Sequence, residues 1–172
     1  GDAGNDTLSG GAGDDSAYGG AGNDVASISD DHNLDFYDLG EASGDADMLA
    51  FGNTQTQTGV KVSFTASDAG TYSYGSGAAS GSFTGAEGVS GTAYADTLNA
   101  GADTDDVSIW GNGGNDAITS GSGNDLVDGG SGDDTLYFGS GRDTVYGGTG
   151  NDLIDDQPNL IFTGDSFIDA GD

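Results

Sequence analysis

Aspartate recurs every nine residues in two parts of the sequence, and its carboxylate is the group with the clearest potential for chemistry. Nine-residue units begin at residues 1, 10 and 19 and, after a gap, at residues 111, 120, 129, 138 and 147. Carboxylate and backbone carbonyl oxygens are the hard ligands that suit calcium. Because solvation alone does not impose a period of nine, the spacing predicts a repeated cation-binding turn rather than a flexible acidic linker. In all eight units the sixth residue is aspartate: Asp6, Asp15, Asp24, Asp116, Asp125, Asp134, Asp143 and Asp152.

Two further positions of each unit indicate how the chain presents these carboxylates. The fourth residue is always glycine, which permits the positive φ angles of a tight turn. The eighth residue is always apolar, so the tripeptide around it reads as a short strand with one inward side chain. A nine-residue unit cannot bury a core alone and must stack on copies of itself. Aspartate suits the turn because its stem is short, whereas glutamate, present only as Glu41 and Glu87, is expected to overshoot. The apolar residues are Leu8, Ala17, Ala26, Ile118, Val127, Leu136, Val145 and Ile154.

The composition excludes several classes of protein. Among 172 residues, 30 are acidic and only 2 basic, for a net charge of -28, which excludes a nucleic-acid binder. A hydrophobic content of 33% with such charge is typical of chains that stay disordered unless something outside the chain stabilises them. There is no cysteine, and His32 is the single histidine, so neither disulfides nor thiolate or imidazole zinc sites can serve. No apolar run approaches the roughly 20 residues of a membrane span.

The repeated units resemble the G-G-x-G-x-D-x-U-x nonapeptide of RTX, or hemolysin-type, calcium-binding repeats, in which U is a large apolar residue. The resemblance implies an all-β fold, a parallel β-roll or β-solenoid with two RTX blocks joined by irregular coils. In this fold each repeat is half a coil, and calcium lies between one turn and the turn two repeats later. The resemblance also implies a bacterial protein that is secreted by type I export and folds on calcium outside the cell.

The resemblance further implies which residues hold several calcium ions. It pairs Asp6 with Asp24, Asp116 with Asp134, Asp125 with Asp143, and Asp134 with Asp152, while Asp15 faces a partner in the irregular stretch after the first block. Asp96 is expected to pair with Asp116, and Asp106 with Asp125, as additional caps. Backbone carbonyls of the same turns are expected to complete the sites, including those of Gly111, Gly129, Gly130, Gly132, Gly147, Gly148 and Gly150.

The chain divides into four parts: RTX block 1 (1–27), irregular β-solenoid coils (28–110), RTX block 2 (111–155) and the start of a further, truncated repeat (156–172). In the second part, Val60, Val62 and Phe64 alternate as in a strand, and Tyr72 and Tyr74 suggest another. Residues 91–99 keep the repeat phase, and 100–110 reads as a half-coil with two extra residues. These features favour a continuing solenoid over a separate domain, in a piece of a larger polypeptide.

The sequence is compatible with three functions. The first is a calcium-binding module that folds after secretion and serves a larger extracellular protein. The second is a structural adhesin segment, although an ice-binding face would need a row of threonines and only Thr149 occupies the third position of a repeat. The third is an enzyme with its site in 28–110. Because no convergent set of histidine, lysine and carboxylate is present, we predict no enzymatic activity. Trp110, Tyr137 and Phe138 form either a sugar-stacking surface or core packing, and the oligomeric state stays open.

Overall fold

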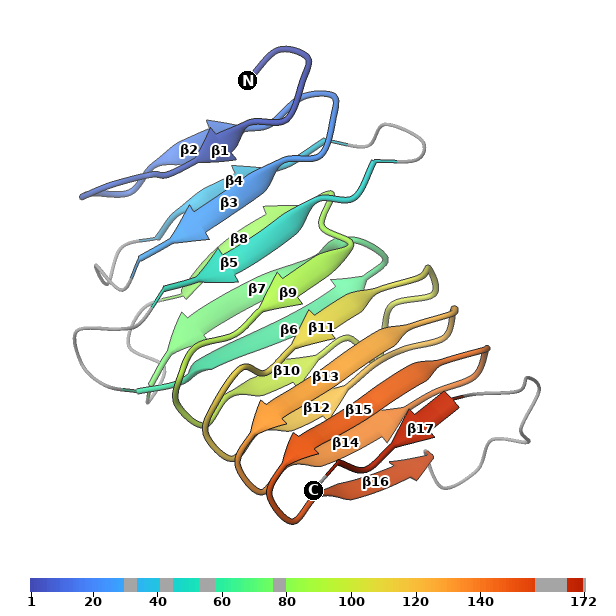
Figure 1. The fold of residues 1–172 in the computed structure, drawn as a ribbon. Helices are drawn as coiled ribbons and strands as arrows, with labels where there is room; N and C mark the ends of the chain where they lie inside the picture. The colour runs from blue at the N-terminus through green and yellow to red at the C-terminus, as the bar shows by residue number, and fades with distance from the viewer. Residues whose placement is uncertain (30–33, 41–44, 53–57, 76–79, 157–166, 172) are drawn as a thin grey trace.

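The chain forms a stack of coils between two facing sheets, as the computed structural model shows for residues 1–29, 34–40, 45–52, 58–75, 80–156 and 167–171. The chain passes back and forth between the sheets, and its two ends lie at opposite ends of the stack (Figure 1). These residues include no helix. Within these ranges there is accordingly no helix that is long and apolar enough to span a membrane.

The first sheet has eight strands, and every neighbouring pair in it is parallel. Parallel pairing follows from the repeat, because each strand of this sheet is reached after a full coil in the same direction. In spatial order the strands are β1 (Thr7–Leu8), β3 (Val25–Ile28), β5 (Met48–Phe51), β9 (Gly88–Ser90), β11 (Ser108–Trp110), β13 (Leu126–Ser131), β15 (Thr144–Thr149) and β17 (Phe167–Asp169).

The second sheet has nine strands. Its neighbours are parallel except where β7 pairs with β6 and with β8, which is antiparallel. In spatial order the strands are β16 (Leu153–Asp156), β14 (Thr135–Phe138), β12 (Ala117–Thr119), β10 (Thr97–Asn99), β6 (Val60–Ala66), β7 (Ala69–Tyr74), β8 (Ser80–Thr84), β4 (Phe36–Asp38) and β2 (Ser16–Tyr18).

The eighth residues of the repeats form the core, as the sequence predicts. In the second sheet Leu98, Ile118 and Leu136 stand directly beside one another and are at most 1% exposed. In the first sheet Ile109, Val127 and Val145 form the corresponding row. The two rows face each other between the sheets, so each nine-residue unit contributes one side chain to a core that extends along the stack. At the two ends, Leu8, Ala17 and Ile154 pack against this core but are only partly buried.

The described residues between 28 and 110 add strands to the same two sheets, with one insertion. The alternating residues at 60–64 and 72–74 form β6 and β7, as predicted, but together with β8 they make an antiparallel meander rather than simple coils. Its core is aromatic, with the rings of Phe64 and Phe83 5.0 Å apart. A Cβ atom on Gly81 would overlap the Tyr72 ring, so the small residue makes room for the large one.

The three aromatic residues considered as a sugar-stacking surface do not share a face. Phe138 is buried in the core, at 3% exposed. Trp110 belongs to the first sheet and Tyr137 to the second. In the predicted final repeat, β17 pairs with β15, and residues 163–166 and 172 lie outside the described part of the chain.

The core row generates a stability prediction. We expect Leu136→Ala, at a side chain with 0% exposure, to lower the free energy of unfolding by about 2–5 kcal/mol, because it removes buried methyl groups and leaves a cavity. Urea unfolding with calcium present measures the loss. The matched control is Leu153→Ala in the neighbouring strand, where the side chain is 53% exposed and the loss should be small. Equal losses at the two positions would contradict the inward placement of the eighth residue.

Candidate metal centre

The turns between strands form two stacks, one along each side of the roll. We call the turns that lead into strands of the first sheet turn stack 1, and those that lead into strands of the second sheet turn stack 2. Position six of each turn is the residue directly before the strand. Asp125 and Asp143 therefore belong to stack 1, and Asp116, Asp134 and Asp152 to stack 2.

In turn stack 2, each position-six carboxylate accepts a hydrogen bond from the backbone of the preceding turn. The Asp96 N–H donates to Asp116 Oδ1 at 2.8 Å, and the Asp116 N–H donates to Asp134 Oδ1 at 2.8 Å. The Asp134 N–H continues the series to Asp152 Oδ1 at 2.9 Å. One oxygen of each aspartate thus joins two successive turns of the stack.

The same contact occurs in turn stack 1 and in the first block. The Asp125 N–H donates to Asp143 Oδ1 at 3.0 Å, and the Asp6 N–H donates to Asp24 Oδ1 at 2.8 Å. The structure therefore places side by side the aspartates of the four main pairs and of the Asp96–Asp116 pair. Asp15, in stack 2, lies beside Asp35 of the irregular stretch, whose Oδ1 accepts its N–H at 3.0 Å.

The second oxygen of most of these carboxylates is buried and has no hydrogen-bond partner in the described part of the chain. This is the case for Oδ2 of Asp24, Asp116, Asp134 and Asp152. A buried carboxylate oxygen without a partner is costly, and such groups in proteins are normally paired or bound to a metal. The repeated arrangement therefore has a row of anionic oxygens that require a positive partner.

Glycine at position one lets a carboxylate oxygen and a carbonyl oxygen approach the backbone closely in turn stack 2. A Cβ atom on Gly129 would lie 2.5 Å from Asp134 Oδ2 and 2.6 Å from the carbonyl oxygen of Gly147. A Cβ atom on Gly111 would likewise overlap Asp116 Oδ2 and the Gly129 carbonyl. An anionic oxygen and a carbonyl oxygen from successive turns thus converge where a side chain would otherwise begin. Calcium in proteins takes oxygen donors of these two kinds.

The other glycines named from the sequence have a different structural role. Gly130, Gly132, Gly148 and Gly150 all have positive φ, between 97° and 136°. A Cβ atom on any of them would overlap the carbonyl oxygen of the turn below, as Gly148 would with Gly130. Glycine at these positions lets successive turns approach closely enough for one ion to contact both.

Burial and mutual repulsion shift the protonation of the carboxylates. Burial raises the pKa of Asp116 from its usual value to about 7, and the nearby charges of Asp96 and Asp134 add to this rise. Burial also raises the pKa values of Asp125, Asp134 and Asp143. The protein environment alone therefore favours a neutral group at these positions, and a bound cation would favour the ionised form instead.

The structure differs from the sequence prediction at Asp106. Val107 occupies position six, because it is the Val107 N–H that donates to Asp125 Oδ1, at 3.1 Å. Asp106 occupies position five and accepts the N–H of Asn124 instead. Val107, and not Asp106, is the residue directly before β11, at the end of a coil that also contains a turn closed by a hydrogen bond from the Asp103 N–H to the Ala100 carbonyl.

Two members of turn stack 1 were missed by the nine-residue pattern. The Asp24 N–H donates to Asp47 Oδ1 at 2.6 Å, and the Asp47 N–H donates to Glu87 Oε2 at 2.7 Å. Glutamate therefore does reach the position-six contact, contrary to expectation. Asp35 was likewise missed in stack 2. The signal that would have identified all three is an acidic residue directly before a short strand, irrespective of its spacing from the previous repeat.

Position five carries a second set of contacts that runs in the opposite direction. The Asn151 N–H donates to Asp133 Oδ1 at 2.8 Å, and the Asp133 N–H donates to Asn115 Oδ1 at 3.1 Å. Here the side chain of the earlier turn accepts from the later turn, whereas at position six the later side chain accepts. Asp133 is exposed, and its hydrogen bonds from Asn151 lower its pKa.

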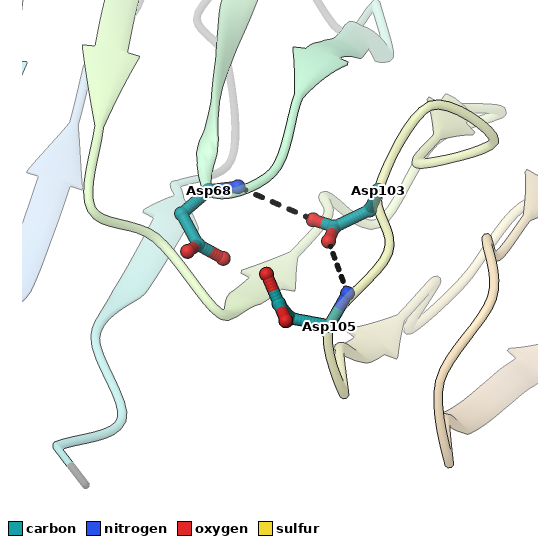
Figure 2. A group of neighbouring side chains, drawn as sticks. All are labelled: Asp68, Asp103 and Asp105. Carbon is teal, nitrogen blue, oxygen red and sulfur yellow. Dashed lines mark hydrogen bonds between the residues drawn. The ribbon is translucent and has the colours of Figure 1, made fainter. Parts of the chain in front are cut away.

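A separate acidic cluster lies where the β6–β7 turn meets the coil with the two extra residues. Figure 2 shows that the carboxylates of Asp68, Asp103 and Asp105 converge there, and their nearest oxygens all lie within 4.8 Å of one another. The N–H groups of Asp68 and Asp105 both donate to the Asp103 carboxylate, at 3.4 and 3.0 Å. Burial raises the pKa of Asp103. The cluster therefore adds negative charge to turn stack 1, but outside the position-six series.

Comparison with known families agrees with this geometry. A family model of the RTX calcium-binding nonapeptide repeat matches in four copies, at residues 1–26, 83–108, 110–145 and 137–156. A search among curated proteins finds no match. The matched segments cover both blocks of repeats and the coils directly before the second block. With its parallel coils, its glycine turns and its rows of buried aspartates, this chain belongs to the family of RTX calcium-binding nonapeptide repeats.

Proposed function

We propose that the chain is a structural module of a larger, secreted bacterial protein and that it folds around several calcium ions after export. The observation that supports this most directly is the row of buried position-six carboxylates, most of which have one oxygen without a partner in the described part of the chain. A cation between successive turns would neutralise these oxygens and join the turns. Folding would then depend on calcium, which is scarce in the cytosol and abundant outside the cell.

The proposed ligands are the position-six aspartates of two successive turns in one stack, completed by carbonyl oxygens of the same turns. In turn stack 2 these are Asp116, Asp134 and Asp152, with the carbonyls of Gly129 and Gly147, which converge with carboxylate oxygens at the position-one glycines. In turn stack 1 they are Asp125 with Asp143. In the first block they are Asp6 with Asp24 in stack 1, and Asp15, next to Asp35, in stack 2.

Calcium fits these donors better than magnesium does. Calcium accepts six to eight oxygens in flexible geometry, whereas magnesium demands a near-ideal octahedron and keeps several water molecules. A site made of carbonyls and carboxylates that are fixed by two stacked turns offers many oxygens but little room for water. Extracellular calcium modules bind in the range of about 10⁻⁴–10⁻³ M. A ligand that binds only the folded state stabilises it by mass action.

The first prediction of this proposal concerns the dependence of folding on metal. We expect the far-ultraviolet circular dichroism of the chain in EDTA to show a random coil, and to convert to a β signal when calcium is added in excess. Magnesium at the same concentration should not produce the conversion. The reason is that the carboxylates of one stack repel one another without a cation between them. A chain that is equally ordered in EDTA would contradict the proposal.

The second prediction compares aspartates within block 2. Asp134 lies between Asp116 and Asp152, whereas Asp143 has one full-repeat neighbour, Asp125. We expect Asp134→Ala to raise the calcium midpoint for folding by on the order of tenfold or more. Asp143→Ala and Asp152→Ala should each raise it less, because each removes a carboxylate from one site rather than two. Calcium titrations followed by the fluorescence of the single tryptophan measure the midpoints.

The matched control for this series is Asp133→Asn. It removes one negative charge directly beside Asp134, yet keeps an oxygen that can accept the Asn151 N–H. The calcium midpoint should stay close to that of the unsubstituted chain. If Asp143→Ala were the most damaging substitution, successive turns of one stack would not share an ion, and adjacent turns from opposite stacks would have to do so.

The third prediction concerns pH in the absence of metal. Burial raises the pKa of Asp116 to about 7 from a usual value of 3.8. Because the folded-state pKa lies above the unfolded value, the folded form binds more protons between these values, so its stability is greatest below about pH 4 and is lost as the pH rises towards 7. We expect metal-free protein to have more β signal at pH 3.5 than at pH 8. A metal-free β signal that grows from pH 4 to pH 7 would contradict this sign.

A further inference from the structure

The turn between β8 and β9 is shorter than its neighbours in turn stack 1 and leaves a hollow on the outside of the roll. Only Gly85 and Ala86 separate the end of β8 from Glu87, which holds position six. The connections on either side are longer, with nine residues before β5 (39–47) and eight before β11 (100–107). Between them lies a hollow of about 190 Å³, with carboxylates at one end (Asp45, Asp47, Glu87 and Asp106) and carbon-rich walls that include Met48, Gly88 and Trp110.

Gly88 opens this hollow although the backbone does not require a glycine. Its φ is not positive, and a Cβ atom on it would meet the Ser108 carbonyl at 3.4 Å and Met48 Cγ at 3.6 Å, which are ordinary van der Waals contacts. Glycine in a strand weakens the strand, and it often marks a place where a ligand approaches closely. The next residue, Val89, points into the core at 1% exposed, so a side chain on Gly88 would point outward and fill the hollow.

The acidic end of the hollow contains two carboxylate oxygens without a partner in the described residues. Asp47 is 2% exposed, and although its Oδ1 accepts the Asp24 N–H, its Oδ2 is buried and unpaired. Oδ2 of Asp45 is also buried and unpaired. Unpaired carboxylate oxygens at the end of a pocket call for a cation that can donate hydrogen bonds.

The walls favour an organic cation over calcium. Calcium would need six to eight oxygen ligands. The thioether of Met48, the bare backbone of Gly88 and the indole of Trp110 offer mainly carbon surface instead. A lysine side chain has the matching chemistry, since its methylene stem packs against apolar surface while its ammonium group provides three donors.

We propose that this hollow binds the side chain of a lysine from a partner polypeptide, with the stem between Met48 and Trp110 and the ammonium group among the carboxylates of Asp45, Asp47, Glu87 and Asp106. The net charge of -28 attracts a basic partner from a distance, and the hollow gives that attraction a specific contact. The proposal assigns an ammonium group, and not calcium, to Asp47 and Glu87, the two position-six residues of turn stack 1 that the nine-residue pattern missed.

The test uses the calcium-loaded chain and Nα-acetyl-lysine amide as the probe. Trp110 is the only tryptophan, so its fluorescence reports directly on the wall of the hollow. We expect a saturable change in fluorescence with the lysine compound and none with Nα-acetyl-norleucine amide, which has an apolar side chain of similar length but no charge. Sodium chloride at equal ionic strength should also give no saturable change. Saturation by the norleucine compound would overturn the proposal.

Two variants locate the effect. Gly88→Leu should abolish the saturable change, because the new side chain fills the hollow, while the calcium midpoint stays as it was. Asp106→Asn should weaken binding by about two- to fivefold, the scale of one partly exposed ion pair. Its matched control is Asp133→Asn, which makes the same change at position five of another repeat. Asp106 and Asp133 each accept an N–H from the next turn of their stack. Unchanged binding in Gly88→Leu, or equal weakening in the two asparagine variants, would overturn the proposal.

Discussion

The structure depends on the different roles of the two oxygens of each position-six carboxylate. One oxygen accepts a backbone N–H from the neighbouring turn, which fixes the side chain and buries it. In most of these aspartates, burial then leaves the other oxygen without water and, in the described residues, without a hydrogen-bond partner. The same hydrogen bond that orders the turn therefore creates the need for a cation. Order of the turns and neutralisation of their charge are two parts of one interaction, which explains why such an acidic chain can have a regular fold.

The position-five contacts show what the turns achieve by hydrogen bonding alone. Asn115, Asp133 and Asn151 link the same turns as the position-six series, but they do so at the surface and in the opposite direction. Opposed series of side-chain acceptors fix the distance and register between successive turns. Because either asparagine or aspartate can accept the N–H at position five, these contacts do not require a charge. The charge at position six therefore serves a purpose other than register, and binding a cation is the purpose consistent with its burial.

The regular part of the fold could be predicted from the sequence because each repeat makes the same contacts as the last. Leu136 and Asp134 follow from the period of nine, and the structure places them in the core row and in the position-six series. Asp47 and Glu87 could not be found in this way, because their turn contacts span 23 and 40 residues. The structure places Asp106 at position five, one residue before the position whose N–H meets Asp125. Where the turns vary in length, strand pairing decides which residues meet, and the spacing of residues in the sequence no longer predicts their contacts.

In the irregular coils, the core row of the first sheet and the position-six series of turn stack 1 behave differently. The core row of the first sheet continues without a gap from Leu49 through Val89 to Ile109, since β5, β9 and β11 pair in register. In turn stack 1, however, the position-six series ends at Glu87, because Val107 has no carboxylate to accept the next N–H, and it resumes at Asp125. The hydrophobic core is thus continuous, whereas the row of carboxylates is interrupted. The interruption concerns the hydrogen-bonded series and not the charge, because the nearby carboxylates of Asp103 and Asp106 still contribute to the raised pKa values of Asp125 and Asp143.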